Sequence, residues 1–289
     1  MIEIKNLSFI YNKDTPFEVK ALDDISLTIK DHSFIGIIGH TGSGKSTFMQ
    51  QLNGLLRPSS GNIIIDGVDI TQKDIKLNKL RESVGMVFQY PEYQLFEETV
   101  AKDVAFGPKN LGLSDEEVAE RVKGAIEDVR LDYEWVKDRS PFELSGGQKR
   151  RVAIAGILAM RPKVLILDEP TAGLDPRARE EILNEIYDIY DIYEKTKITV
   201  VLVSHSMEDV FTYANEIVVL SKGKLIMHKS TDEAVKEREL LKKYDVGVPE
   251  ITEFMFTLQE KYPGLNPYVK TVEEARHNIL EYFEVKKNV

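Results

Sequence analysis

A glycine-rich loop at residues 39–47 constrains the fold of this 289-residue chain more than any other feature. Its sequence, GHTGSGKST, follows a short apolar stretch, residues 33–38, and precedes residues 45–56, which are expected to be helical. Glycines let successive backbone N–H groups turn inward toward phosphate oxygens, and the helix N-terminus adds partial positive charge. Strand, loop and helix in this order therefore predict a phosphate-binding loop in an α/β domain.

The residue types in this loop match the chemistry of a bound nucleoside triphosphate. Lys45 is expected to reach the β- and γ-phosphates, and the Ser46 hydroxyl is expected to ligate Mg²⁺. By itself the loop indicates only nucleotide binding, because kinases, GTPases and many ATPases share it. The nucleotide-binding residues that it predicts are Gly39, His40, Thr41, Gly42, Ser43, Gly44, Lys45, Ser46 and Thr47.

A second candidate site follows the apolar residues 164–167, where the chain continues with Asp168 and Glu169. A carboxylate at the end of a buried strand is costly unless it holds a cation, so Asp168 is expected to orient Mg²⁺. Glu169 comes next, where the chain leaves the strand, and there it can polarise an attacking water as a general base. The pair complements the phosphate-binding loop.

The distribution of β-forming residues predicts two kinds of sheet. Residues 2–10, 19–29 and 61–65 lie on both sides of the first helix and indicate an antiparallel sheet at the N-terminal edge. Residues 164–167 and 198–203 are continuous apolar stretches with β-branched residues, which is typical of central parallel strands.

Helical periodicity accounts for much of the rest. Residues 114–129 begin with the capping pattern Ser-Asp-Glu-Glu and carry Val and Ile at helical spacing. We therefore expect a mainly helical insert over residues 92–160, and a helix over residues 179–195 between the two central strands.

From residue 232 onward the composition shifts toward charged helices that are separated by Gly and Pro. The predicted division is a nucleotide-binding domain, residues 1–231, followed by a small helical extension, residues 232–289. The helices expected in the extension span residues 234–244, 251–262 and 272–283.

Composition excludes several classes of function. The net charge of −10 disfavours bulk binding to nucleic acid, because an acidic protein repels phosphate backbones. The absence of cysteine excludes disulfides and thiolate metal sites. A membrane-spanning helix needs about 20 mostly apolar residues, and the longest apolar stretches here have the length of strands. If the protein serves a membrane, we expect it to do so from the surface.

The string LSGGQ at residues 144–148, called the signature below, matches the signature of the ATP-binding-cassette (ABC) ATPases, and the chain resembles that family over residues 1 to about 230. The resemblance implies an ABC ATPase fold, in which Tyr11 stacks on adenine. It also implies that Gln89 contacts Mg²⁺ and the attacking water, and that His205 contacts the γ-phosphate. Asp175, in Ala-Gly-Leu-Asp, is similar to the loop that helps to build the opposite site in a dimer.

The signature has a physical interpretation as well. A hydroxyl and bare backbone N–H groups at the start of a helix, expected over residues 148–160, form a second phosphate-binding surface. In the family this surface covers the nucleotide held by a partner subunit, so ATP joins two chains head to tail. The residues implied are Ser145, Gly146, Gly147 and Gln148.

Residues 88–100 and 103–108 resemble the ATPases of energy-coupling-factor importers of vitamins and metals, and are more similar to the second of the two ATPases in that group. This resemblance implies a homologous ATPase partner, a membrane coupling protein and a substrate-binding membrane subunit, with the chain peripheral at the cytoplasmic face of the membrane. The alternatives are an ATPase of a conventional importer or exporter, or a soluble ABC protein that acts on nucleic acid. Neither the cargo nor the identity of the second ATPase follows from the sequence.

Two surface features leave alternatives open. Glu92, Glu97 and Glu98 lie among aromatic residues and are expected either to accept an arginine-bearing helix of the membrane partner or to form a solvated acidic loop. The apolar residues of the C-terminal helices, Phe254, Leu258, Ile279 and Phe283, fit either a contact between the two ATPases or packing within the chain.

Overall fold

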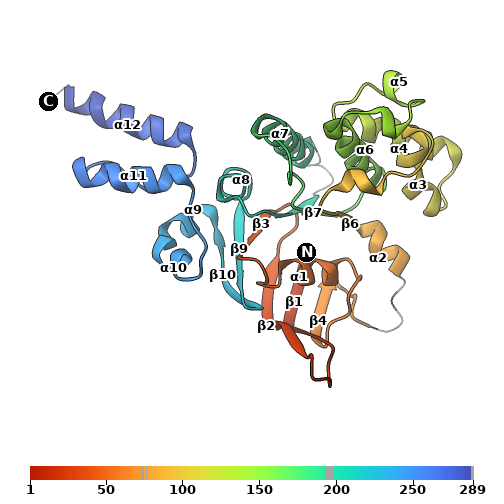
Figure 1. Ribbon diagram of the computed structural model, residues 1–289, viewed down its shortest axis with the longest axis horizontal. Coiled ribbons are helices and arrows are strands. Elements are labelled where there is room, and N and C mark those ends of the chain that lie inside the picture. Colours follow the sequence, from red (N-terminus) through yellow and green to blue (C-terminus); the bar gives the residue numbers. More distant parts are fainter. Residues whose placement is uncertain (73–74, 76, 193–197, 288–289) are drawn as a thin grey trace.

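Two sheets form the centre of the computed structural model (Figure 1), which describes residues 1–72, 75, 77–192 and 198–287. The smaller sheet consists of β1 (Ile2–Tyr11), β2 (Val19–Ile29), β4 (Ser60–Ile65) and β5 (Val68–Asp69). Its strands pair antiparallel in the order β2-β1-β4-β5. The antiparallel sheet predicted at the N-terminal edge is confirmed.

The larger sheet carries the site. It consists of β3 (Phe34–Ile38), β6 (Val84–Val87), β7 (Val164–Asp168), β8 (Thr199–Val203), β9 (Glu216–Ser221) and β10 (Lys224–Ser230). The order is β10-β9-β3-β8-β7-β6, and every pair except β10–β9 is parallel. The strands predicted at residues 164–167 and 198–203 are indeed adjacent central strands, and their carboxyl ends meet at one edge.

Side-chain alternation along β3 explains how the two faces of the larger sheet are covered. Ile35 and Ile37 point toward the antiparallel sheet and the helix α1 (Lys45–Leu52), whose Phe48 is fully buried there. Phe34 and Ile38 belong to the core on the other face. That face is covered by α7 (Pro176–Ile192) and α8 (Met207–Tyr213), together with the helical insert.

One helix ends earlier than expected, and the expected end of another lies outside the described residues. The helix expected over residues 45–56 ends at Leu52, because Asn53 accepts a hydrogen bond from the Leu55 N–H (3.1 Å) and Gly54 adopts a φ of 70°. Of the helix expected over residues 179–195, residues 193–195 lie outside the described part of the chain. A short helix, α2 (Leu77–Ser83), was not predicted.

The insert expected to be helical contains only helices and connecting loops. Its elements are η1 (Pro91–Gln94), α3 (Val100–Asn110), α4 (Asp115–Asp128), α5 (Tyr133–Val136), η2 (Pro141–Glu143) and α6 (Gly146–Leu158). Ser114 and Glu117 form the capping box that the sequence indicated. In Figure 1 these helices lie together at the upper right, away from the antiparallel sheet.

The C-terminal part has two different relations to the rest of the chain. The single helix expected over residues 234–244 is wrong. The chain instead forms α9 (Thr231–Ala234), η4 (Val235–Glu237) and α10 (Arg238–Lys243), whose bends let Ala234, Val235 and Leu241 join the main core. By contrast, α11 (Glu250–Lys261) and α12 (Val272–Lys287) pack around a small core of their own: Met255, Leu265, Val269 and Ala275.

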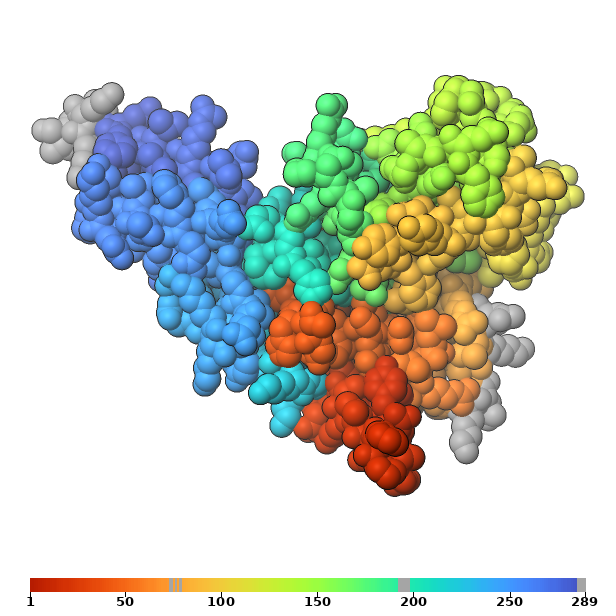
Figure 2. All heavy atoms as spheres, viewed as in Figure 1, coloured from red at the N-terminus to blue at the C-terminus, as the bar shows by residue number. Residues whose placement is uncertain are grey.

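The hairpin of α11 and α12 projects as a separate lobe in the space-filling view (Figure 2). Leu258 and Ile279 pack against the hairpin's own core, whereas Phe254 is exposed. Within the described residues, no helix is both long and apolar enough to cross a membrane.

Candidate active site

The loop at residues 39–47 connects the buried strand β3 to α1 and curls around the Lys45 side chain. A Cβ atom on Gly39 would clash with the carbonyl oxygen of Leu220, so the close approach of these two segments requires glycine. The Lys45 ammonium group donates to the carbonyls of Gly39 (2.6 Å) and His40 (3.2 Å). Burial lowers the pKa of Lys45, although Glu169 and Asp168 act in the opposite direction.

One further residue predicted to bind nucleotide, Tyr11, lies beside this loop, and His40 lies within it. Tyr11, at the end of β1, shares a 3.1 Å hydrogen bond with the hydroxyl of Thr47, and its ring is partly exposed. His40 donates from Nδ1 to the carbonyl of Thr41 (2.7 Å). The Tyr11 ring is therefore fixed next to the phosphate-binding loop with surface left for a planar group to stack on.

The three residues predicted to be catalytic come together at the carboxyl ends of three neighbouring strands. Gln89 follows β6, Glu169 follows β7 and His205 follows β8. The Gln89 amide donates to one carboxylate oxygen of Glu169 (3.1 Å), and Nε2 of His205 lies 2.7 Å from the other. Glu169 has a φ of 48°, a left-handed conformation that few non-glycine residues adopt and that often marks functional sites.

Asp168 is the last residue of β7 and directly precedes Glu169. Burial raises its pKa to about 6, the neighbouring Glu169 charge adds to this, and Lys45 and His205 counteract it. Two adjacent carboxylates, one of them poorly solvated, favour a bound cation. The described residues contain no group of three or more His, Cys, Asp or Glu side chains that could hold a metal ion.

The signature lies at the start of α6, in the helical insert, whereas α1 begins at the phosphate-binding loop near the centre of the molecule (Figure 1). Ser145 and Gln148 bond each other in a capping box: the Ser145 hydroxyl accepts from the Gln148 N–H (3.3 Å) and the Gln148 amide oxygen accepts from the Ser145 N–H (3.1 Å). A Cβ atom on Gly146 or Gly147 would meet nothing within 4 Å. The backbone of this helix start is thus open for contact with another molecule.

Asp175 begins the first turn of α7, where its carboxylate accepts from the N–H groups of Arg177 and Ala178, both at 3.1 Å. The loop before it passes close to Tyr90, whose ring lies 3.2 Å from where a Cβ on Gly173 would be. Asp175 is therefore outside the Gln89–Glu169–His205 group of its own chain.

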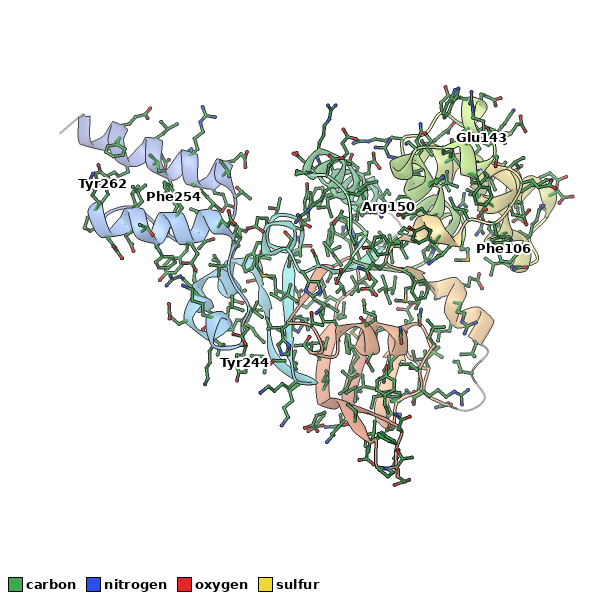
Figure 3. The ribbon with its side chains drawn as sticks, viewed as in Figure 1. Phe106, Glu143, Arg150, Tyr244, Phe254 and Tyr262 are labelled. Carbon is green, nitrogen blue, oxygen red and sulfur yellow. The ribbon has the colours of Figure 1, made fainter. Side chains whose placement is uncertain are left out.

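Arg150 is a buried residue that the sequence motifs did not single out (Figure 3). Only 1% of it is exposed, although it carries a guanidinium group. It donates to both carboxylate oxygens of Glu92 (3.1 and 2.9 Å) and to the carbonyls of Pro170 (2.8 Å) and Ala172 (3.1 Å). Arg150 thereby connects α6 to η1 and to the segment that follows Glu169.

The expectation that Glu92 offers its charge to a partner, or to solvent, is wrong. Its carboxylate is committed to Arg150 within the same chain, because a fully buried guanidinium requires a paired anion. The only signal for this pairing was the position of Arg150 on the inward face of the helix that follows the signature. Glu98, in contrast, is exposed and pairs with Lys102.

A strand leading into a phosphate-binding loop, and an acidic pair bracketed by Gln89 and His205, define an ATP-binding cassette. The family model described as ABC transporter matches residues 22–172. The chain belongs to the ABC transporter family, within the group of energy-coupling-factor ATP-binding proteins, and is an ATPase.

Several known proteins are similar over nearly the whole chain. The energy-coupling factor transporter ATP-binding protein EcfA2 of Caldanaerobacter subterraneus subsp. tengcongensis is 57% identical over 288 residues, covering 100% of this chain and 99% of the relative. EcfA2 of Clostridium tetani is 54% identical over 285 residues, covering 99% of this chain and 98% of the relative.

Solved structures agree on the fold. CbiO1 of Clostridium perfringens, described as part of the ABC transporter complex cbiONQ, has a TM-score of 0.73 and 39% identity, and the match covers 84% of this chain and 93% of that one. The ATP-binding cassette MJ0796, in a dimeric post-hydrolysis state bound to ADP and Pi, has a TM-score of 0.68 and 29% identity, covering 80% of this chain and 99% of that one.

Proposed function

We propose that the chain hydrolyses Mg-ATP as one half of a head-to-tail pair of ATP-binding cassettes, and that this drives import of a vitamin or metal micronutrient. It would work with membrane partners, a coupling protein and a substrate-binding subunit, from the cytoplasmic face of the membrane. The similarity to EcfA2 proteins extends through the C-terminal hairpin as well as the cassette. That extent supports the energy-coupling-factor assignment.

One observation carries the catalytic part: the Glu169 carboxylate is held between Gln89 and His205 at the strand ends beside the phosphate-binding loop. Glu169 acts as the general base for the attacking water, Gln89 orients it, and His205 contacts the γ-phosphate. Lys45 and the loop N–H groups neutralise phosphate charge as it develops.

A magnesium ion fits the residues present, since two adjacent carboxylates, Asp168 and Glu169, stand where β7 ends, and a buried carboxylate is costly unless a cation pairs with it. Ser46, Gln89 and Asp168 would hold it. The ion would supply charge neutralisation on the nucleotide's phosphates.

The half-site arrangement follows from where the signature lies. The residues from Ser145 to Gln148 are in the helical insert and bond one another, so we assign their open backbone to the nucleotide of the partner chain. The N-terminus of α6 is then a second phosphate-binding surface. Hydrolysis releases the pair, because ADP and phosphate repel each other where ATP joined the two chains.

A groove of about 630 Å³ between α3 and α6 is the proposed docking place for a helix of the membrane coupling protein. Its exposed aromatic residues, Phe96 and Phe106, meet edge to face at 5.0 Å. Exposed apolar surface at the mouth of a groove is typical of a helix-binding site. Because Glu92 is internal, the apolar residues are expected to supply most of the affinity.

Substitution of the proposed base tests the catalytic part. Glu169→Gln should bind ATP with nearly unchanged affinity while turnover falls by roughly 10²–10⁴-fold. Nucleotide binding is measured by fluorescence titration and phosphate release by a coupled assay. Hydrolysis close to the wild-type rate would refute the assignment of Glu169.

Co-purification from detergent-solubilised membranes tests the transport part. Phe106→Ser should reduce recovery of the membrane coupling protein. Phe17→Ser, at a more exposed aromatic residue on the β1–β2 loop (77% against 48%), serves as the control. If no separate coupling protein co-purifies with the wild-type chain, the result would argue for a conventional importer or exporter.

A further inference from the structure

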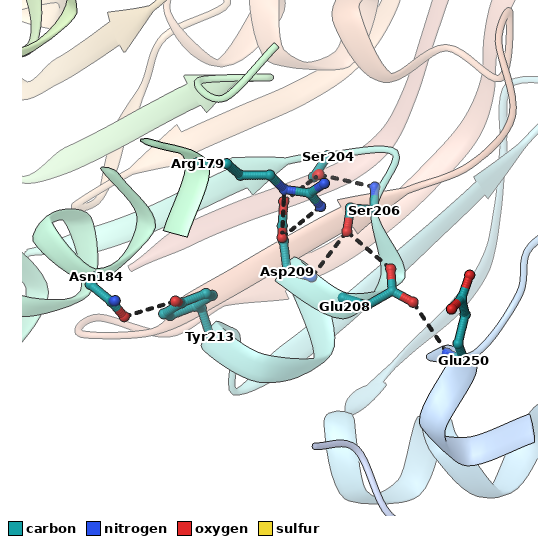
Figure 4. A network of polar contacts seen from close by, with 8 residues as sticks. All are labelled: Arg179, Asn184, Ser204, Ser206, Glu208, Asp209, Tyr213 and Glu250. Atoms are coloured by element: carbon teal, nitrogen blue, oxygen red, sulfur yellow. Dashed lines mark hydrogen bonds and ion pairs between the residues drawn. The ribbon is translucent and has the colours of Figure 1, made fainter. Parts of the chain in front are cut away.

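A polar network joins the first turns of α7 and α8 (Figure 4). Arg179 donates from Nε to both carboxylate oxygens of Asp209 (3.0 Å each) and from Nη2 to Oδ1 (2.7 Å). The Asp209 side chain is 8% exposed and that of Arg179 is 35% exposed. A bidentate pair with one partner buried fixes geometry more firmly than a surface ion pair does.

The same carboxylate holds the loop that carries His205. The Ser204 hydroxyl donates to Asp209 (3.4 Å) and accepts from the Ser206 N–H (3.0 Å). The Ser206 hydroxyl in turn accepts from the Asp209 N–H (3.2 Å) and caps α8. Both neighbours of His205 are therefore anchored to the Asp209 position.

His205 itself depends on this anchoring. Its side chain is 49% exposed, so packing does little to hold the imidazole, yet Nε2 lies 2.7 Å from Glu169. The backbone on either side must supply the orientation. Asp209 is the charged group that this backbone contacts through Ser204.

At its other end the network reaches the loop of Asp175. The Arg179 N–H donates to the Asp175 carbonyl (3.0 Å), so the two residues share one turn of α7. The Asp175 carboxylate caps that turn. Asp175, Arg179 and Asp209 are therefore joined by a continuous series of hydrogen bonds.

We propose that Asp209 and Arg179 are positioning residues for ATP hydrolysis, which hold His205 against Glu169 and link it to the Asp175 loop. The proposal rests on the function proposed above, in which His205 contacts the γ-phosphate. Among the described residues, no hydrogen bond or ion pair joins either residue to Glu169 or to the phosphate-binding loop, so both would act through His205. Their loss should lower kcat and leave KM for ATP nearly unchanged.

The decisive experiment is a double-mutant cycle between Asp209→Asn and His205→Ala, with kcat from single-turnover phosphate release. In the wild-type background Asp209→Asn should lower kcat by about tenfold, with KM changed less than about twofold, because small misplacements of a catalytic group are costly. In the His205→Ala background it should lower kcat by less than about twofold. The control Arg177→Met, on the same turn of α7 but 89% exposed, should keep wild-type kcat.

Two results would overturn the proposal. The first is a kcat of Asp209→Asn within about twofold of wild type. The second is a double variant whose fold-loss in kcat equals the product of the losses in Asp209→Asn and His205→Ala alone. That result would show that Asp209 has a structural role independent of His205. If Asp209→Asn does not fold, Arg179→Met takes its place in the cycle, because Arg179 is half-buried and its removal leaves the Ser204–Asp209 contact.

Hydrogen exchange tests the anchoring of the His205 loop separately from ATP hydrolysis, on which the proposed function depends. Hydrogen exchange of the amides at residues 204–207, without nucleotide, should be faster in Asp209→Asn than in wild type. Unchanged exchange would contradict the anchoring itself. A wild-type protein that fails to hydrolyse ATP would contradict the proposed function and leave the exchange result to decide the anchoring.

Discussion

Removal of the Glu92 carboxylate is the sharpest perturbation that the structure offers outside the catalytic residues. In Glu92→Gln the buried guanidinium of Arg150 keeps its two carbonyl acceptors, Pro170 and Ala172, but loses its anion. Breaking a buried ion pair from one side costs about 3–5 kcal/mol. Glu92 is 18% exposed and the carbonyls remain, so we expect about 3 kcal/mol, the low end of this range.

Thermal and urea unfolding measure this change directly. At about 2–4 °C per kcal/mol for a chain of this size, Tm should fall by about 6–12 °C. Glu98→Gln is the matched control, because Glu98 pairs with Lys102 on the exposed surface of the same segment, and its Tm should equal that of wild type.

The double variant Glu92→Gln with Arg150→Met adds a test of the mechanism. A flexible apolar side chain in place of the guanidinium removes the unpaired charge, so the double variant should be more stable than Glu92→Gln alone. Wild-type stability of Glu92→Gln, or a double variant less stable than either single one, would refute the assignment of Arg150 as a buried cation that needs Glu92.

The remaining predictions concern the signature, the hairpin and pH. The Tm of Gly146→Ala should match or exceed that of wild type, because the added Cβ meets no atom and alanine favours a helix over glycine by about 1 kcal/mol. Its ATPase activity should fall, because the added methyl group covers the backbone at the start of α6. Removal of residues 250–289 should leave a folded ATPase, because the hairpin has its own core. Removal of residues 232–289 should instead uncover the main core and lower the free energy of unfolding, measured in urea, by on the order of 5 kcal/mol. The hydrogen bond from Arg238 lowers the pKa of Glu253, so this pair helps to attach α11 fully above pH 4.5 and stops doing so as the pH falls through the lowered pKa. Proteolysis of the hairpin should therefore be slower at pH 6 than at about pH 3, and Arg238→Met should remove this difference.

The phosphate-binding loop and the Asp168–Glu169 pair were predictable because local pattern determines them, whereas the roles of Gln89 and His205 followed from the family resemblance. The phosphate-binding loop needs glycine, lysine and hydroxyl residues at fixed spacing, and the strands that precede Glu169 and His205 are apolar except for Asp168 at the end of the first and Thr199 at the start of the second. Parallel strands then bring their carboxyl ends together, which is why Gln89, Glu169 and His205 meet despite separations of 80 and 36 residues.

The interactions that the sequence did not predict are long-range pairs of ordinary residue types. Arg150 lies on the inward face of α6, but no local pattern identifies its partner Glu92, which lies 58 residues away. Similarly, Arg179 and Asp209 pair only because α7 and α8 pack on the same face of the sheet. The single helix expected over residues 234–244 was wrong for a related reason, since the core that this segment covers is built from distant strands.

The central claim is that each ATP lies between the loop of one cassette and the signature of another. It is tested by sedimentation of the purified Glu169→Gln chain with its ATPase partner, with and without Mg-ATP. We predict that Mg-ATP converts single cassettes to a two-cassette complex, and that Ser145→Arg in both chains abolishes this conversion while each chain still binds ATP. Association that is independent of ATP, or that survives Ser145→Arg, would contradict the account.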